Sequence, residues 1–148
     1  MKTIPALLVG SIALLVFACS KDKFETKPRI EVRSINTLEL AQNQTLSIRL
    51  DYFDKEGDLS EGDFFAAKLR LNALPLGTGH PDLVDTFYYT LPEFPERDKG
   101  EITLQLEYNR LKESLSENDT VMFRLAVRDK EGNESDTIST EQIVILLP

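Results

Sequence analysis

The sequence has almost none of the residues that most often carry chemistry in small proteins. Its 148 residues include one cysteine, one histidine and no tryptophan. A single cysteine excludes a disulfide within the chain and a zinc site built on cysteines. A single histidine argues against a histidine metal centre or a histidine-activated nucleophile. Motifs of the G-x-S-x-G, H-E-x-x-H and phosphate-loop types are also missing from the sequence, so we expect a protein that is not an enzyme.

The sequence also has fewer basic residues than acidic ones. The chain has 17 Lys+Arg against 25 Asp+Glu, which gives a net charge of -8. Phosphate backbones are bound by clustered lysine and arginine, so this balance predicts that the protein does not bind nucleic acid. Hydrophobic residues still make up 41% of the chain, enough to form a folded core.

Long apolar runs are absent except at the N-terminus. There, about 15 residues from Ile4 to Ala18 follow Lys2 and end at Cys19. This is shorter than the roughly 20 apolar residues that a membrane-spanning helix needs. A short apolar run after a positive residue is typical of a secretory signal. The alternatives are a plain secretory signal that happens to precede a cysteine, and an uncleaved helical anchor.

The residues around the cysteine resemble the lipobox of bacterial lipoproteins. Val16-Phe17-Ala18-Cys19 has an aliphatic residue, a small residue and then the cysteine at the lipobox positions. The resemblance implies that residues 1–18 are removed and that Cys19 is acylated on its sulfur and its new amino group. Ser20, in place of an aspartate, resembles the outer-membrane sorting pattern. We therefore expect a lipidated tether, 19–27, anchored to the outer membrane on its periplasmic or cell-surface side.

Alternation of apolar and polar residues dominates the chain after this tether. The runs with this pattern are 28–33, 44–53, 64–71, 85–91, 101–108, 121–128 and 138–146. The pattern is typical of strands with one buried face and predicts antiparallel sheets. Within 64–71, the apolar residues at the odd positions 65 to 71 are expected to face the core. One segment, 109–117, is expected to form a short helix, because Leu111 and Leu115 are four residues apart.

Seven short strands and a short helical connection indicate a β-sandwich. Over residues 28–148 the chain resembles the immunoglobulin-like and fibronectin type III-like domains of bacterial surface lipoproteins. It lacks the cysteine pair and the tryptophan of antibody domains. A small jelly roll or a lipocalin-like barrel is the structural alternative.

Two loops of the expected sandwich repeat the letters D-K-E-G, at 54–57 and 129–132. Aspartate and glycine at these positions suit a tight turn, so turn formation alone explains the repeat. In an immunoglobulin-like sandwich, however, these loops lie at the same end. That end would gather the carboxylates of Asp51, Asp54, Glu56, Asp58, Glu61, Asp63, Asp129, Glu131, Glu134 and Asp136.

Crowded carboxylates repel one another, and a hard cation such as calcium would relieve that repulsion. The sequence therefore gives a second interpretation of the repeat, a calcium site. Its expected ligands are Asp54, Glu56, Asp58, Asp129 and Asn133. These residues do not match an EF-hand, because the glycine of the first loop falls at the fourth position and not the sixth.

A third loop, 92–100, is expected at the same end and carries Phe94 between two prolines. Such an aromatic residue either plugs the loop by local packing or stacks on a ligand such as a sugar ring. Exposure of Phe94, Tyr88 and Phe64 on one face would favour ligand binding. The glycine-rich stretch 77–81 is expected to be a turn, with His80 as a solvated loop residue.

Two functional hypotheses follow. The first is a lipid-anchored, non-catalytic envelope module with a structural or protein-interaction role, whose partners are the membrane, through Cys19, and an envelope protein. The second is a lipoprotein that binds a small ligand or carbohydrate through the acidic loops and Phe94, assisted by calcium. No other cofactor is expected from the sequence.

Overall fold

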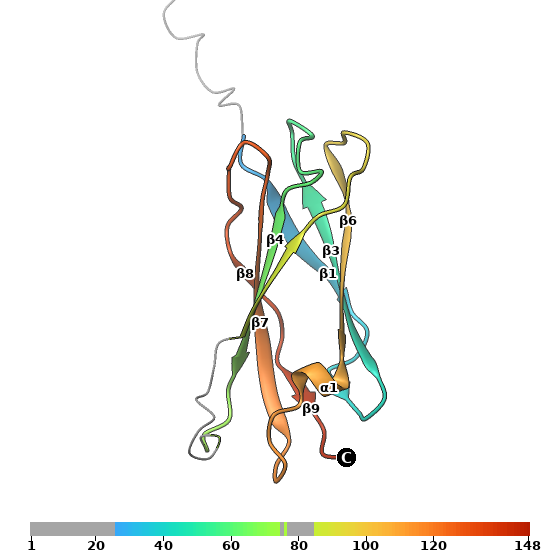
Figure 1. Cartoon of the computed structure of the whole chain (residues 1–148), viewed down its shortest axis with the longest axis vertical. Helices are drawn as coiled ribbons and strands as arrows, with labels where there is room; N and C mark the ends of the chain where they lie inside the picture. Colours follow the sequence, from blue (N-terminus) through green and yellow to red (C-terminus); the bar gives the residue numbers. More distant parts are fainter. Residues whose placement is uncertain (1–25, 75, 77–84) are drawn as a thin grey trace, which may run out of the picture.

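The computed structural model describes residues 26–74, 76 and 85–148, which are nearly all β-structure (Figure 1). Seven of the elements are strands β1 (Arg29–Ile35), β2 (Glu39–Leu40), β3 (Thr45–Phe53), β4 (Asp63–Arg70), β5 (Asp85–Thr90), β6 (Lys99–Glu107) and β7 (Asp119–Arg128). The others are helix α1 (Tyr108–Leu111) and strands β8 (Ile138–Ser139) and β9 (Ile143–Ile145).

The strands in the described part of the chain form two sheets that pack against each other (Figure 1). One has the order β1-β3-β6, and the other has the order β2-β9-β7-β4-β5 with β8 beside β7. The all-β sandwich predicted from the alternation is confirmed. The pairs are antiparallel except for β2 and β9, which run parallel, so the expectation of purely antiparallel sheets is corrected at that edge.

The core lies between the two sheets and is built by the alternation itself. Along β3 and β7, the inward positions are buried and the positions between them are more exposed. The buried side chains of these two strands include Leu46, Ile48, Leu50, Tyr52, Val121, Phe123, Leu125 and Val127. Burial of each such side chain stabilises the fold by about 1.5–3 kcal/mol.

Strand β4 has the opposite orientation to the one predicted. Phe64, Ala66 and Lys68 are buried, whereas the odd positions face outward and are only partly covered. Apolar residues occupy both faces of this strand, so alternation alone gave the wrong face. The structure instead places a lysine in a core position, where charged neighbours accept its hydrogen bonds.

The predicted strand 138–146 is divided into β8 and β9. The Thr140 hydroxyl accepts a hydrogen bond from the backbone N–H of Phe123 (3.0 Å) and donates one to the carbonyl of Glu141 (2.8 Å). A side chain thus takes the place of a backbone group in the ladder, and regular pairing stops there. Strand β2, only two residues long, was not predicted.

The predicted helix 109–117 is shorter than expected and forms a single turn, α1. The N–H groups of Glu113 and Ser114 both donate to the Asp119 carboxylate at 2.9 Å. They are therefore not available for helical hydrogen bonds, and the helix ends at Leu111.

Three loops lie together at one end of the sandwich, called here the loop end: residues 54–62, 91–98 and 129–137 (Figure 1). The N–H of Lys130 approaches the carbonyl of Asp58 at 3.5 Å, and the N–H of Phe94 donates to the Ser60 hydroxyl at 2.9 Å. The prediction that these loops share one end is confirmed. Helix α1 lies at the opposite end, called the helix end (Figure 1).

Several predictions concern residues outside those that the structure describes. They are the leader 1–18, Cys19, the tether up to residue 25, and the turn 77–81 with His80. In the described ranges, no helix has both the length and the apolar character needed to cross a membrane.

Candidate functional site

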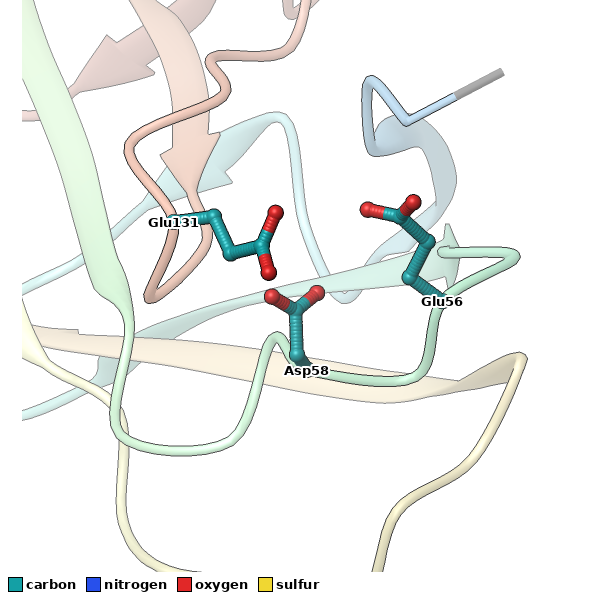
Figure 2. Close-up of side chains that lie close together, drawn as sticks. All are labelled: Glu56, Asp58 and Glu131. Atoms are coloured by element: carbon teal, nitrogen blue, oxygen red, sulfur yellow. The ribbon is translucent and has the colours of Figure 1, made fainter. Parts of the chain in front are cut away.

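Three acidic side chains converge at the loop end and are called here the carboxylate cluster: Glu56, Asp58 and Glu131. One oxygen of each lies within 4.8 Å of the oxygens chosen from the other two. Figure 2 shows the three carboxylates turned toward one another, two from the β3–β4 loop and one from the β7–β8 loop. The two D-K-E-G loops therefore meet through their acidic side chains.

The first loop is shaped by Asp54. Its carbonyl accepts the N–H of Gly57 (3.1 Å), and its Oδ2 accepts the N–H of Leu59 (2.9 Å). Gly57 has φ +78°, a conformation that side-chain-bearing residues rarely adopt. This tight turn brings the carboxylates of Glu56 and Asp58 to the same side of the loop (Figure 2).

The second loop is a turn closed by its own side chains. Asp129 Oδ1 accepts the N–H of Asn133 at 2.8 Å, and Oδ2 accepts the amide Nδ2 of the same residue at 2.9 Å. Gly132, with φ +92°, donates its N–H to the Asp129 carbonyl. Asp129 and Asn133 thus satisfy each other, and the turn presents Glu131 to the cluster.

Carboxylate oxygens are left without hydrogen bonds beneath the first loop. Asp54 is only 1% exposed, yet its Oδ1 has no hydrogen-bond partner among residues 26–74, 76 and 85–148. The same holds within those ranges for the buried Oδ1 of Asp58. An unpaired buried acceptor is costly, by about 1–3 kcal/mol, and such atoms in native proteins call for an explanation such as a bound ion.

The electrostatics of the cluster are unfavourable for negative charge. Burial, then the charges of Asp129 and Asp54, raise the pKa of Asp58 to about 6. The pKa of Glu56 is also raised, by loss of solvation and then by repulsion from Glu131, Asp129 and Asp54. The site therefore favours either protonation or a cation.

Two basic residues of the loop end, Lys130 and Arg128, form ion pairs with carboxylates outside the cluster. Lys130 contacts Glu61 at 2.9 Å, and this hydrogen bond raises the pKa of the lysine. Arg128 contacts Glu134 at 2.6 Å. These pairs neutralise acids at the rim of the loop end and leave the charge of the cluster in place.

The five predicted ligands occupy different positions in the structure. Glu56 and Asp58 lie in the cluster, Asp54 lies buried below them, and Asp129 and Asn133 close the second turn. Glu131 was not among the predicted ligands. The sequence carried a signal for it, because Glu56 and Glu131 occupy the same position of the two D-K-E-G repeats.

Phe94 lines a cavity of about 510 Å³ between the edges formed by β5 and β6. Its ring lies 5.9 Å from that of Tyr52, and Phe64 and Tyr89 line the same cavity. Arg97 and Glu101 supply charge at this site. Phe94 is half-buried, so it packs against the core and also forms part of a cavity wall.

Phe94, Tyr88 and Phe64 are not exposed on one face, the arrangement that would have favoured ligand binding. Phe64 is 2% exposed and points into the core, whereas Tyr88 is 71% exposed. The ring of Tyr88 packs edge-on against Phe65, on the outer face of the larger sheet. The three aromatic residues thus belong to different surroundings.

A buried ionic network at the helix end was missed by the sequence analysis. Asp119 accepts hydrogen bonds from Arg70 Nε (2.8 Å) and Lys112 Nζ (2.9 Å), in addition to the two backbone N–H groups described above. Lys68, fully buried, pairs with Asp85 at 2.9 Å and with Glu113. The network joins β4, β5, β7 and the segment after α1.

Comparisons with known proteins give no family. No protein-family model matches the chain, and no curated protein matches it. A β-glucosidase from Listeria innocua in complex with gluconolactone is 12% identical over 80% of this chain and 16% of its own, with a TM-score of 0.45. A β-glucosidase from Kluyveromyces marxianus in complex with glucose is 11% identical over 83% of this chain and 15% of its own, with a TM-score of 0.39.

The sporulation control protein Spo0M from Bacillus subtilis is similarly distant. It is 10% identical over 82% of this chain and 49% of its own, with a TM-score of 0.38. The chain thus spans about a sixth of the glucosidases and about half of Spo0M. At these identities and TM-scores, the likenesses carry no argument about what the chain does.

Proposed function

We propose that the protein is a lipid-anchored, non-catalytic module of the bacterial outer membrane, with a structural or protein-interaction role. The observation that carries this proposal is the position of the chain's only cysteine, at the end of a short apolar leader and within Val16-Phe17-Ala18-Cys19. Two or three acyl chains hold a protein on a bilayer almost irreversibly, because each buried methylene contributes about 0.8 kcal/mol.

The arrangement of buried charge supports a non-catalytic role. Lys68, Arg70 and Asp119 are held in ion pairs at the helix end, away from the cavity beside Phe94. The residues described around that cavity include no pairing of a nucleophile with a histidine base.

The strand order supports an immunoglobulin-like assignment within this proposal. The sheets β1-β3-β6 and β9-β7-β4-β5 correspond to the A-B-E and G-F-C-C′ arrangement of such domains.

The chain enters β1 from the loop end, where Lys27 pairs with Asp136 at 2.5 Å. A tether over residues 20–27 reaches at most about 28 Å, so the loop end would lie close to the membrane.

Metabolic labelling with an alkyne analogue of palmitate tests the anchor. The full-length protein should take up the label and fractionate with the outer membrane, and Cys19→Ser should lose both properties. Ser20→Ala is the matched control and should keep the label. An unlabelled mature protein with a free thiol at Cys19 would overturn the proposal.

The cavity beside Phe94 favours a second candidate function, binding of a small ligand such as a sugar ring. Its volume of about 510 Å³ lies in the range of ligand pockets, and aromatic rings form its walls. A panel of monosaccharides should raise the melting temperature of the protein, and Phe94→Ala should abolish the response. Tyr88→Ala, on the outer face, is the control. Equal responses from the wild type and Phe94→Ala would reject this candidate.

A further inference from the structure

We propose that a calcium ion binds at the loop end between Glu56, Asp58 and Glu131, near the buried carboxylate of Asp54. The site does not depend on the lipid anchor proposed above. It would join the β3–β4 loop to the β7–β8 loop through one ion.

The spacing of the cluster fits a shared cation of this size. Three oxygens that all lie within 4.8 Å of one another lie within about 2.8 Å of a common point, 4.8 Å divided by the square root of three. Calcium takes oxygen ligands at about 2.3–2.6 Å. A shift of a few tenths of an ångström in side chains on two loops would complete the contact, and Glu56 and Glu131 are exposed and free to make it.

An independent observation comes from Asp54. Its Oδ2 accepts the N–H of Leu59, in the loop that carries Glu56 and Asp58, and its charge is close enough to raise the pKa of both side chains. Its Oδ1 is buried and, in the part of the chain that is described, has no partner. A buried carboxylate oxygen without a donor is a ready cation ligand, and a cation would remove the cost of leaving it unpaired.

The charges around the cluster also favour a bound cation. The charges of Asp54 and Asp129 act on both Glu56 and Asp58, and so does the charge of Glu131. Lys130, the lysine next to Glu131, is paired with Glu61. The cluster therefore carries an excess of negative charge that a divalent cation would offset.

Calcium suits this arrangement better than magnesium. Calcium accepts six to eight oxygens in irregular geometry, including carboxylates, backbone carbonyls and water. Magnesium needs a near-ideal octahedron at about 2.0–2.1 Å and keeps most of its water. Flexible acidic side chains from two loops, open to solvent on one side, meet the first set of requirements.

Calorimetry and thermal unfolding test the site. The full-length protein, in a mild detergent and stripped with a chelator, is titrated with calcium chloride. We expect saturable binding of one ion and a rise in melting temperature of roughly 4–10 °C at 10 mM calcium. Absence of binding heat together with an unchanged melting temperature would overturn the proposal. An equal rise with magnesium at the same concentration would show general charge neutralisation and would also overturn it.

Substitutions locate the ion. Glu131→Gln and Glu56→Gln change exposed residues, so both variants should fold, and each should weaken calcium binding by at least about tenfold. Without calcium, both should melt at or above the temperature of the wild type, because repulsion is removed. Glu141→Gln removes the same charge from an exposed residue outside the two loops and should bind calcium like the wild type. Unchanged affinity in Glu131→Gln would place the ion elsewhere and refute the site.

Discussion

The two ends of the sandwich both take aspartates out of water, but they give them different partners. At the helix end, Asp119 is fully buried and accepts hydrogen bonds from Arg70, Lys112 and two backbone N–H groups. Burial by itself would raise the pKa of Asp119, yet these hydrogen bonds, that of Arg70 foremost, lower it to about 2.

At the loop end, Asp54 and Asp58 lie among further acids. One oxygen of each is buried with no hydrogen bond from any described residue, and the pKa of Asp58 is raised to about 6. The same residue type therefore stabilises one end and strains the other. At the helix end one buried oxygen, Oε2 of Glu113, also lacks a hydrogen bond from the described residues, but Asp119 itself is fully compensated by basic and N–H groups, whereas Asp54 and Asp58 are surrounded by like charge.

Removing the carboxylate of Asp119 should give the largest effect. Asp119→Ala leaves the buried guanidinium of Arg70, whose side chain is 1% exposed, without its main partner. Breaking such a buried pair costs about 3–5 kcal/mol. Urea denaturation of the wild type and the variant at pH 7 measures the loss.

The matched control for this change is Asp136→Ala. Asp136 also forms an ion pair, but its side chain is 91% exposed. The control should lose less than about 1 kcal/mol, as surface ion pairs do. Similar losses in the two variants would show that the helix end does not depend on its buried pair.

Acid should weaken the helix end in a defined window. The folded pKa of Asp119, about 2, lies below its unfolded value, so its contribution is complete above about pH 4 and disappears as the pH falls to 2. Arg70 of β4 and Lys112 both donate hydrogen bonds to Asp119. Arg70 also donates to a second carboxylate, that of Glu117. The contribution is about 2–3 kcal/mol.

A double difference isolates this term from other titrating groups. Free energies of unfolding are measured for the wild type and Asp119→Asn at pH 5, 4, 3 and 2. The difference between the two free energies of unfolding should decrease by about 2–3 kcal/mol from pH 5 to pH 2. A constant gap would mean that the carboxylate is not held in its charged form.

Alternation along the sequence was sufficient to predict the sandwich but not its buried charges. The core positions of β3 and β7 could be predicted because apolar residues occupy one face and polar residues the other. In β4 both faces are apolar, and Lys68 takes an inward position only because Asp85 and Glu113 lie beside it. Those partners come from distant segments of the sequence, so no local sequence pattern could predict the pairing.

The candidate site divides in the same way. The meeting of the two loops could be predicted, because it follows from strand order in a sandwich. The repeat carried a signal for Glu131, at the position of Glu56. The exclusion of Asn133 from the cluster could not be predicted, because it depends on the turn in which the Asp129 side chain binds the Asn133 amide. Turn geometry at the level of single hydrogen bonds decides which side chain reaches the cluster.

Close backbone contact holds the base of the loop end together, in addition to the ion pairs of Lys130 with Glu61 and of Arg128 with Asp63. A methyl group added at Gly62 would lie 2.3 Å from the Arg128 carbonyl oxygen and 2.9 Å from that of Leu59. Because both atoms belong to the backbone, Gly62→Ala must displace a loop, and we expect a loss of about 2–3 kcal/mol in chemical denaturation.

Gly132→Ala provides the comparison for that contact. Its added methyl would meet no described atom within 4 Å, so the cost comes from its φ of +92° alone and should be about 1 kcal/mol. Only Gly62→Ala should also reduce the calcium response, since it moves the two loops apart. Equal losses in both variants would mean that the loops are not in tight contact.

Asp58→Asn should change the free energy of unfolding less than the substitutions above. It should raise stability, whereas Asp119→Ala lowers it. Removing the charge of Asp58 relieves its repulsion with Asp54, Asp129 and Glu131 while keeping a side chain of the same shape. In the absence of calcium at pH 7, we expect a gain in stability of roughly 1 kcal/mol, allowing for partial solvent screening.

Asp51→Asn is the control, because Asp51 pairs with Arg33 and lies outside the cluster. At millimolar calcium the gain should reverse, since the wild type is stabilised by the ion and the variant is not. A loss of stability in the metal-free variant would mean that Asp58, like Asp119, is compensated within the chain, and the contrast between the two ends would no longer hold.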